Sequence, residues 1–426
     1  MVLGWTLCWI VVLLAIAQSL ATLIYVRRLL SYKDVIVPHE NLPEALVILS
    51  LRGGDEGLVD CLNGLARQEY PRYQLKIVID HVSDPAHEIV ARWMSTSPRV
   101  PVSIEFLQNP SEWSSLKCSG VRQALRNLDP RIGAIVMVDG DADAYPYWLR
   151  DLISPLTQPG VGAVTGNRWY FPADAAIGSW CRFIYNGLSL PAMDWFALTW
   201  GGSLAVRREV ALSESFLHTL EHASCEDHAV KNSLAAHGLS LHFNPRVILL
   251  NPESCGYLGC LQFVFRQLLW TRLYHPAWLP ILGHALGSYL ILATTFLLAA
   301  GWVMWPEYRN LSGWLFASLG LHITAVVGSL LVTDAVIRHV SLGKQGVNSR
   351  LSFGTRLKTI AYVAFAAPWT LVLYTIAILK ATLARRVVWR EVVYEVLPSG
   401  NLRVVTHHPL AKQRGQSQAD RSRSAA

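Results

Sequence analysis

The sequence has few charged residues and no cysteine spacing of the kind found in metal sites. Only 16% of its 426 residues are Asp, Glu, Lys or Arg, whereas 52% are hydrophobic and the mean hydropathy is +0.29. A chain of this composition is too apolar to be wholly soluble, so we expect part of it to lie in a bilayer. The seven cysteines lack paired ligand spacing. This excludes a zinc site and fits a reducing compartment.

No basic stretch precedes the first apolar run, residues 5–26; Arg27 and Arg28 follow it instead. This order argues against a cleaved signal peptide and favours a retained transmembrane anchor over residues 1–30. Three later apolar segments in the region 281–380 are also long enough to cross a bilayer. They are residues 281–304, 315–336 and 360–379.

Basic residues from Arg338 to Lys358 separate the last two apolar segments. By the positive-inside rule this loop is cytoplasmic. Two crossings separate it from residues 41–255, which are therefore expected in the cytoplasm as well. A third crossing would place Arg385 and Arg386 outside, against the same rule. One segment is thus expected not to span fully, and Pro368 makes the last segment the first candidate.

Most of the basic residues behind the net charge of +7 stand beside apolar segments or near the end of the chain. Anionic lipid headgroups are therefore the expected partner, and nucleic acid is not. Residues 256–280 mix large apolar residues with arginines, which predicts amphipathic helices in the membrane interface. Residues 381–426 are expected to form a basic, partly disordered tail, solvated after Thr406. The oligomeric state stays open.

Between residues 41 and 255, short apolar segments of strand length alternate with segments in which apolar residues recur at helical spacing. This alternation predicts an α/β domain with a mostly parallel central sheet. The expected strands are residues 45–51, 75–79, 102–106 and 135–138, and Leu58, Leu62 and Leu65 mark the first helix. In such sheets, ligands bind at the carboxyl ends of the strands.

Acidic residues follow two of these strands. After the second strand, the carboxylates of Asp80 and Asp84 either accept hydrogen bonds from a base or ribose, or lie in a turn in which Asp and Ser cap the next helix. Asp139 and Asp141 stand at i and i+2; in an extended segment their side chains point the same way and can hold Mg²⁺ or Mn²⁺ against a diphosphate. The alternative is an acidic surface turn. Asp143 is expected to be exposed.

Asp227 stands at the start of a predicted helix that stops at Gly238. Its carboxylate could remove a proton from an acceptor hydroxyl, as a direct displacement at a sugar carbon requires. Ser224 and Asp227 also have the spacing of a capping box, in which the acid merely closes the start of the helix. The residues alone leave both interpretations open.

Five motifs in this order resemble the family 2 glycosyltransferases, in particular the ceramide glucosyltransferase-like branch, over residues 44–278, with a weaker likeness at Trp389-Arg390-Glu391. The motifs are VIDHVSDPA, VMVDGDADAYPYWL, GGSLAVRRE, EDHAVKNSLAAHG and FRQLLWTRL. The resemblance implies a nucleotide-diphospho-sugar transferase domain of the GT-A type and an inverting single displacement. It also implies that Asp80 contacts the nucleotide, that Asp139 and Asp141 hold the cation, and that Asp227 is the general base.

Further positions match the family's pattern. Lys117 matches a lysine near the donor, although it could also be a surface lysine at a helix start. Gly201 and Gly202 match a loop that lets the backbone approach the sugar or acceptor. Arg266 and Trp270 match the membrane-edge motif, which departs from the pattern because Leu269 replaces an arginine. Arg272, one turn away, is the candidate substitute.

These features predict a multi-pass protein of a bacterial-type plasma membrane with a cytoplasmic catalytic domain. The predicted activity moves a hexose from a nucleotide-sugar, such as UDP-glucose, to a lipid acceptor. A processive polysaccharide synthase is the first alternative, but it needs more spanning helices and an intact final motif. A non-catalytic membrane scaffold is the second, and it would not need Asp139, Asp141 or Asp227. Likeness of fold does not fix the substrate.

Overall fold

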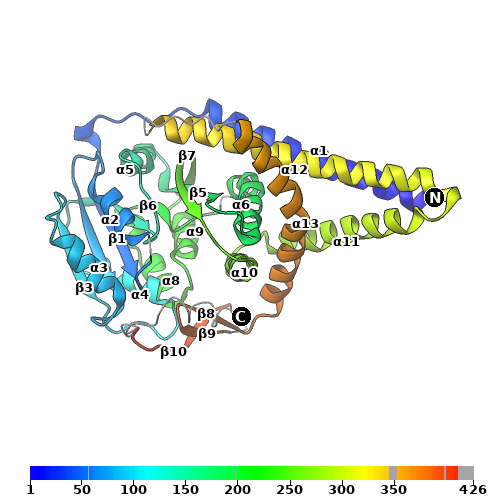
Figure 1. Cartoon of the computed structure of the whole chain (residues 1–426). Helices are drawn as coiled ribbons and strands as arrows, with labels where there is room; N and C mark the ends of the chain where they lie inside the picture. Colours follow the sequence, from blue (N-terminus) through cyan, green and yellow to red (C-terminus); the bar gives the residue numbers. More distant parts are fainter. Residues whose placement is uncertain (56, 197, 345–352, 398–399, 411–426) are drawn as a thin grey trace. The chain divides into compact units, whose positions relative to one another are not determined.

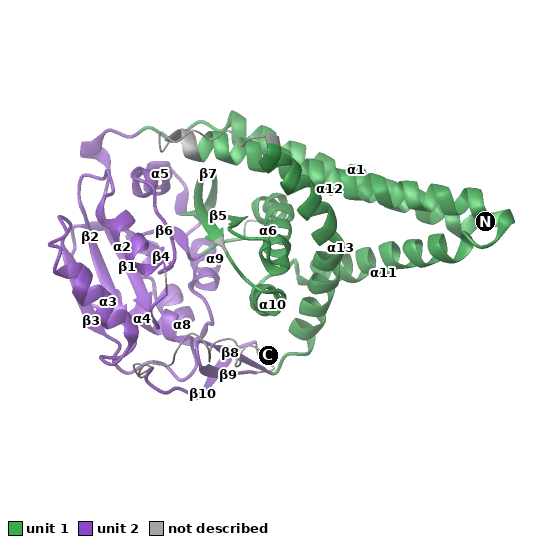
Figure 2. Ribbon diagram, viewed as in Figure 1, with its two compact units in different colours: residues 1–36, 164–200, 241–385 green, residues 37–163, 201–240, 386–426 purple. Residues whose placement is uncertain are grey.

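The computed structural model of the chain describes residues 1–55, 57–196, 198–344, 353–397 and 400–410. The chain divides into two compact units, each assembled from separate stretches of sequence (Figure 2). Unit 1 comprises residues 1–36, 164–200 and 241–385, and unit 2 comprises residues 37–163, 201–240 and 386–426.

Unit 2 contains a mostly parallel sheet with the strand order β3-β2-β1-β4-β6 (Figure 1). Its strands are β1 (Glu44–Leu51), β2 (Tyr73–Ile79), β3 (Val102–Phe106), β4 (Ile132–Val138) and β6 (Ser203–Arg207). β1 pairs in parallel with β2 and β4, β2 pairs in parallel with β3, and β6 is antiparallel to β4. Parallel strands that are buried on both faces have continuously apolar sequences. All four strands expected from such runs are confirmed. Three of them, β1, β2 and β4, begin one to three residues earlier than expected.

Helices pack around this sheet. They are α2 (Leu58–Ala66), α3 (Pro85–Met94), α4 (Leu116–Ala124), α5 (Trp148–Ile153), α7 (Arg208–Ala211), α8 (Glu214–His222) and α9 (Glu226–Ala236), with short 3₁₀ turns η1 (His39–Asn41) and η2 (Ser154–Thr157). Of these, α3, α4 and α8 begin at a side chain that caps them. Asp84 caps α3 by accepting a hydrogen bond from the amide of Ala86. Ser115 caps α4 in the same way, through the amide of Cys118. Such caps satisfy amide groups that have no partner within the helix.

A small antiparallel sheet forms the last part of unit 2. Its strands are β8 (Arg386–Trp389), β9 (Val392–Val396) and β10 (Leu402–Thr406), in the order β10-β9-β8. The β8–β9 hairpin turns at Arg390 and Glu391, whose φ angles of 48° and 64° lie in the left-handed region. Two-residue hairpin turns usually place Gly or Asn there. The sequence indicated only a basic tail over these residues and missed all three strands.

Unit 1 is mainly helical. Its helices are α1 (Val2–Ser31), α6 (Ile177–Trp195), α10 (Tyr257–Tyr274), α11 (Trp278–Trp302), α12 (Arg309–Lys344) and α13 (Phe353–Leu383), with the 3₁₀ turn η3 (Pro306–Tyr308). Two neighbouring strands, β5 (Val161–Pro172) and β7 (Ser240–Glu253), have most of their residues in this unit.

Among the described residues, four helices are long and apolar enough to cross a membrane: α1, α11, α12 and α13. This confirms the four apolar segments expected from the sequence. Large apolar side chains such as Leu13, Leu290 and Leu321 are exposed on them, as is typical of surfaces that face lipid. Pro368 lies inside α13, and the helix continues through it. The proline therefore does not interrupt the last segment.

Candidate active site

A cluster of charged side chains lies at the carboxyl ends of the unit 2 strands. The ammonium of Lys117, on the first turn of α4, is 2.6 Å from a carboxylate oxygen of Asp139 and 2.5 Å from one of Glu226. Asp139 directly follows β4, and Glu226 is the first residue of α9. One ammonium thus bridges two acids that are 87 positions apart in the chain.

Burial makes these contacts strong. The side chains of Glu226, Lys117 and Asp139 are 1%, 16% and 29% exposed. Burial alone would lower the pKa of Lys117, but Asp139 and Glu226 outweigh it and raise that pKa well above its usual value. Lys117 is therefore a permanent cation between two carboxylates. The alternative of a surface lysine at a helix start is wrong.

Asp227 follows Glu226 and points to the same place. The backbone N–H of Gly201 donates a hydrogen bond to it, and a Cβ atom built on Gly201 would overlap with Glu226 and meet Asp227. Only glycine allows the backbone to come this close. Burial, together with the charge of Glu226, raises the pKa of Asp227 well above its usual value, while Lys117 lowers it.

The first residues of α9 show that Ser224 and Asp227 do not form a capping box. The N-cap residue of α9 is Cys225, not Ser224, and its side chain makes no capping hydrogen bond. Asp227 therefore occupies the second position of the helix, one residue earlier than a capping box requires. The acid remains available for another role. Gly202, the other glycine singled out in the sequence, is buried in the turn that leads into β6.

The segment after β4 differs from the sequence expectation. Residues 139–142 form a turn, closed by a hydrogen bond from the amide of Ala142 to the carbonyl oxygen of Asp139. The premise of an extended backbone that aims Asp139 and Asp141 the same way is therefore wrong. Asp141 is partly buried, and Asp143 is exposed, as expected. No group of three or more His, Cys, Asp or Glu side chains suited to a metal ion occurs in the part of the chain that the structure describes.

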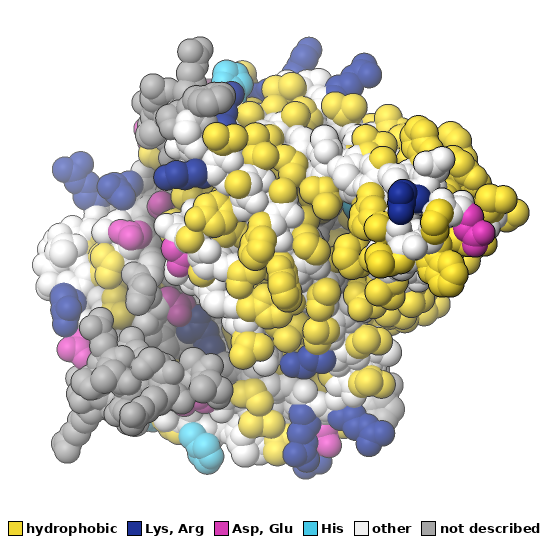
Figure 3. All heavy atoms as spheres, turned by 45° about the vertical axis from the view of Figure 1, so that its right-hand side comes forward, with side chains coloured by type: hydrophobic (Ala, Val, Ile, Leu, Met, Phe, Trp, Pro, Cys, Tyr) yellow, Lys and Arg dark blue, Asp and Glu magenta, His cyan; other side chains and the backbone are white. Residues whose placement is uncertain are grey.

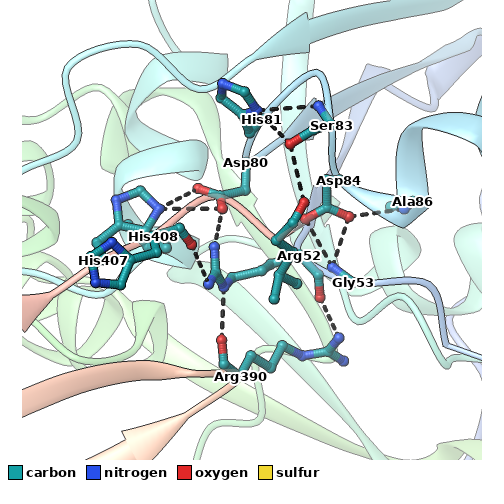
Figure 4. A network of polar contacts seen from close by, with 12 residues as sticks. Arg52, Gly53, Asp80, His81, Ser83, Asp84, Ala86, Arg390, His407 and His408 are labelled. Carbon is teal, nitrogen blue, oxygen red and sulfur yellow. Dashed lines mark hydrogen bonds and ion pairs between the residues drawn. The ribbon is translucent and has the colours of Figure 1, made fainter. Parts of the chain in front are cut away.

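Asp80 lies at the end of β2 within a network of polar contacts (Figure 4). Its side chain is 1% exposed and forms an ion pair with Arg52, while Nε2 of His407 is 2.9 Å from its other oxygen. Arg52 also donates to the carbonyl oxygens of Arg390, at 2.8 Å, and His408, at 2.9 Å. Asp84, not Asp80, caps the next helix. The alternative of a turn that caps the helix after this strand is therefore confirmed, with Asp84 as the cap.

The C-terminal ribbon, residues 386–410, supplies half of this network. Arg390 donates to the carbonyl oxygen of Arg52 (Figure 4) and to Asp55, and the carbonyl oxygen of Leu410 accepts from Ser83. Sequence analysis missed Arg390 and His407 as site residues and placed His407 in a solvated tail, which is wrong. The only sequence signal was the weak likeness to the family at Trp389-Arg390-Glu391.

The membrane-edge motif lies on α10 of unit 1. Leu269, which stands in place of the expected arginine, is fully buried, so an arginine there would place a charge among apolar neighbours. Arg272 donates to the carbonyl oxygens of Ala381, at 2.5 Å, and Ala384, at 3.1 Å. It stabilises the end of α13 in the manner of a C-terminal cap. Arg266 and Trp270 lie on the same helix, both partly buried.

A separate hollow of about 1080 Å³ lies at the opposite edge of the unit 2 sheet. It is lined by residues at the starts of β1 and β2, including Glu44 and Tyr73, and by none of the predicted site residues. Ligand sites in parallel sheets occur at the carboxyl edge. The charged cluster around Lys117 is therefore the stronger candidate.

Comparison with known proteins supports an enzyme of one class. The model of "Glycosyl transferase family 21" matches residues 7–402. A curated relative, "Glycosyltransferase AglE" of Haloferax volcanii, is 30% identical over 130 residues, or 30% of this chain; the chain spans only 40% of that protein's length.

Solved structures resemble the chain at low identity. "Mannosyltransferase PcManGT from Pyrobaculum calidifontis in complex with GDP-Man and Mn2+" aligns over 88% of this chain and 99% of its own, at 18% identity and a TM-score of 0.45. The glucosyl-3-phosphoglycerate synthase of M. tuberculosis aligns over 54% and 81%, at 13% identity and a TM-score of 0.36.

Proposed function

Because the chain belongs to glycosyl transferase family 21, we propose that it moves a hexose from a nucleotide-sugar donor to the hydroxyl group of a membrane lipid. The protein is a glycosyltransferase; the donor sugar, the lipid acceptor and the roles of individual residues are our proposal. Sphingoid, diacylglycerol and hopanoid lipids fit the ceramide glucosyltransferase-like motifs. We also propose that the catalytic domain faces the cytoplasm of a bacterial-type plasma membrane.

The cluster around Lys117 is the observation that supports this proposal most. Through one ammonium, it brings the residue after β4 together with the start of α9, where Asp227 lies. The base and the metal aspartate of the proposed mechanism thus share one edge of the sheet. A structural role alone gives no reason to bury three acids and one lysine there, because burying charge is costly.

In the proposed reaction, Asp227 is the general base. Its carboxylate takes the proton of the acceptor hydroxyl, whose oxygen forms a bond to the anomeric carbon of the sugar. The bond from that carbon to the diphosphate breaks, and the configuration inverts. The raised pKa of Asp227 suits this role, because a base with a pKa nearer the working pH is a better proton acceptor.

The donor set suits a hard divalent cation. Asp139 and Asp141 offer carboxylate oxygens, which Mg²⁺ and Mn²⁺ prefer. We propose that these two aspartates hold the ion, which would neutralise charge on the leaving diphosphate. Lys117 already shows that Asp139 attracts a cation.

The remaining family positions complete the proposal. Asp80 contacts the nucleotide, Gly201 and Gly202 let the backbone approach the sugar or acceptor, and Arg266 and Trp270 act at the membrane edge. Since Asp80 is already held by Arg52 and His407, the donor must compete with His407 for a carboxylate oxygen.

A lipid-extraction assay tests the function. Membranes that contain the protein are incubated with radiolabelled UDP-glucose or GDP-mannose and extracted with organic solvent. Label in the lipid phase supports the proposal. Label in an insoluble polymer would indicate a processive synthase. With every nucleotide-sugar tried, no more label in the lipid phase than in membranes that contain an inactive variant would contradict transfer to lipid.

The Asp141→Ala variant tests the metal assignment in the same assay. We expect it to lose both labelling and the response to added Mn²⁺, because one of two protein ligands is gone. Asp143→Ala is the matched control, since Asp143 is an exposed acid two positions further on. Full activity of Asp141→Ala would remove Asp141 from the metal site.

A further inference from the structure

The packing of unit 2 restricts how the chain can cross a membrane. Residues 37–163 and 386–410 belong to this single unit, joined by the contacts of Arg52 with Arg390 and of Asp80 with His407. Both stretches must therefore lie on the same side of the bilayer. The chain between them has to cross an even number of times. Yet three helices that could span, α11, α12 and α13, lie in that stretch of the described chain.

At least one of these three helices therefore does not cross, and their packing within unit 1 distinguishes them. α12 packs along α1 and against α11, and the three run together to the right in Figure 1. Leu7 and Cys8 of α1 form a buried cluster with Ala299 of α11 and Leu315 of α12. These helices form one bundle of potential membrane spans.

α13 packs most extensively along α6 and α10, neither of which is a candidate span, and less extensively against α11 and α12. Near its start, Tyr362 stacks on Trp180 of α6 with ring centroids 4.8 Å apart. In its middle, the carbonyl oxygen of Trp369 accepts a hydrogen bond of 3.1 Å from Tyr257 of α10. At its end, Arg272 of α10 caps the carbonyl groups. In Figure 1, α13 runs across the direction of α1 and α12.

From these contacts we infer that α13 lies in the plane of the membrane, at the boundary of headgroups and acyl chains, on the side that carries unit 2. α1, α11 and α12 cross the bilayer. The partner of the exposed face of α13 is thus a lipid surface. This inference does not rest on the proposed reaction.

The surface of α13 suits that partner. Apolar side chains are exposed along it, including Phe365 (62%), Trp369 (49%) and Leu379 (44%), while Lys358 and Lys380 stand toward its two ends. An apolar face bordered by lysines is typical of helices that lie in the interface, where lysines meet the headgroups. Figure 3 shows apolar side chains over much of the face turned forward, with Lys and Arg at its margins.

The arrangement also agrees with the charge rule. With three crossings, the basic residues near Arg338, near Arg356 and near Arg386 all lie on the side of unit 2. With four crossings the last group would lie alone on the other side. The conflict found in the sequence therefore disappears when α13 does not cross.

Labelling with a membrane-impermeant maleimide tests the inference. Single cysteines are introduced as Glu40→Cys, Glu307→Cys, Arg356→Cys and Val405→Cys in sealed vesicles of known orientation. Labelling is measured for each peptide by mass spectrometry, so that the native cysteines do not interfere. We expect positions 40, 356 and 405 to react from one side, and position 307 from the other.

Each other outcome overturns a specific step. Reaction of positions 356 and 405 from opposite sides would show that α13 crosses. Reaction of position 307 from the side of position 40 would show that α11 does not cross. Reaction of positions 40 and 405 from opposite sides would contradict the packing of unit 2 on which the even number of crossings depends.

The depth of spin labels provides a second test. Nitroxides at Phe365→Cys and Leu379→Cys lie about 21 Å apart along the axis of α13. In vesicles of phosphatidylethanolamine and phosphatidylglycerol, we expect oxygen and a nickel chelate to report the same shallow depth for both. The matched pair Trp314→Cys and Leu321→Cys on α12, one near the start of the helix and one nearer its middle, should differ in depth. A deep label at position 365 and a shallow one at 379 would overturn the inference.

Discussion

Replacing Lys117 with methionine tests whether the charged cluster is as strongly coupled as its geometry indicates. The change leaves Glu226, 1% exposed, without its cation. Removing one partner of a buried pair costs about 3–5 kcal/mol. Because the side chains of Lys117 and Asp139 are 16% and 29% exposed, we expect a loss of stability at the lower end of this range, about 3 kcal/mol. In a domain of 150–250 residues this corresponds to a fall in Tm of about 6–12 °C.

The chain offers a matched control in Lys76. Its ammonium is 2.7 Å from Glu105 and its side chain is also 16% exposed, but Glu105 is 37% exposed. Lys76→Met should therefore cost about 1 kcal/mol or less, as for ion pairs in contact with water. The double variant Lys117→Met/Glu226→Gln should recover much of the loss, because Glu226, the acid that is 1% exposed, is then neutral.

The measurement is thermal unfolding of the purified protein in detergent at one scan rate. It is followed by the fluorescence of the tryptophans in unit 2. Equal losses for Lys117→Met and Lys76→Met would refute the reasoning, because Lys117 holds two acids, one of them 1% exposed, whereas Lys76 holds a single acid that is 37% exposed. A double variant no more stable than Lys117→Met would refute it as well.

Three further predictions concern individual site residues. Asp227→Asn should bind the donor normally but lose about 10²–10⁴-fold in turnover, and unimpaired turnover would remove the base assignment. Because Asn resembles the protonated acid, the variant and the parent should be about equally stable below pH 3.8, and the variant should become the more stable of the two as the pH rises through the raised folded pKa of Asp227. His407→Ala frees an oxygen of Asp80 and should lower the KM for the donor with kcat nearly unchanged, whereas a raised KM would show that His407 assists binding. Gly201→Ala should cost about 1–3 kcal/mol of stability and most of the activity, while Gly283→Ala, where a Cβ meets nothing within 4 Å, should change neither.

The sequence predicted the parts of the fold that depend on local pattern. β1 and β4 are buried on both faces and are written as apolar runs, so both could be found. The four apolar helices were equally clear. β8 and β10 were missed because they have four and five residues and include Arg386 and Arg403, which interrupt any apolar run.

The candidate site, too, could be predicted from the sequence only in part. Acids at strand ends could be predicted as candidates, because the carboxyl edge of a parallel sheet collects ligands. The residues that contact these acids could not be predicted. The partner of Asp80 is His407, 327 positions away, and no periodicity relates two such residues. The role of Lys117 stayed ambiguous for a similar reason, since a lysine at a helix start is equally common on the surface.

The order of the stretches that form unit 2 has a consequence for biosynthesis. A ribosome that has completed residue 240 has produced the whole parallel sheet of this unit, but not the ribbon that contacts Arg52 and Asp80. That ribbon emerges only after every hydrophobic helix has been handed to the insertion machinery. Newly made chains therefore pass through a stage in which Arg52 and Asp80 lack their contacts with the ribbon, and a premature stop codon after α13 would leave them there.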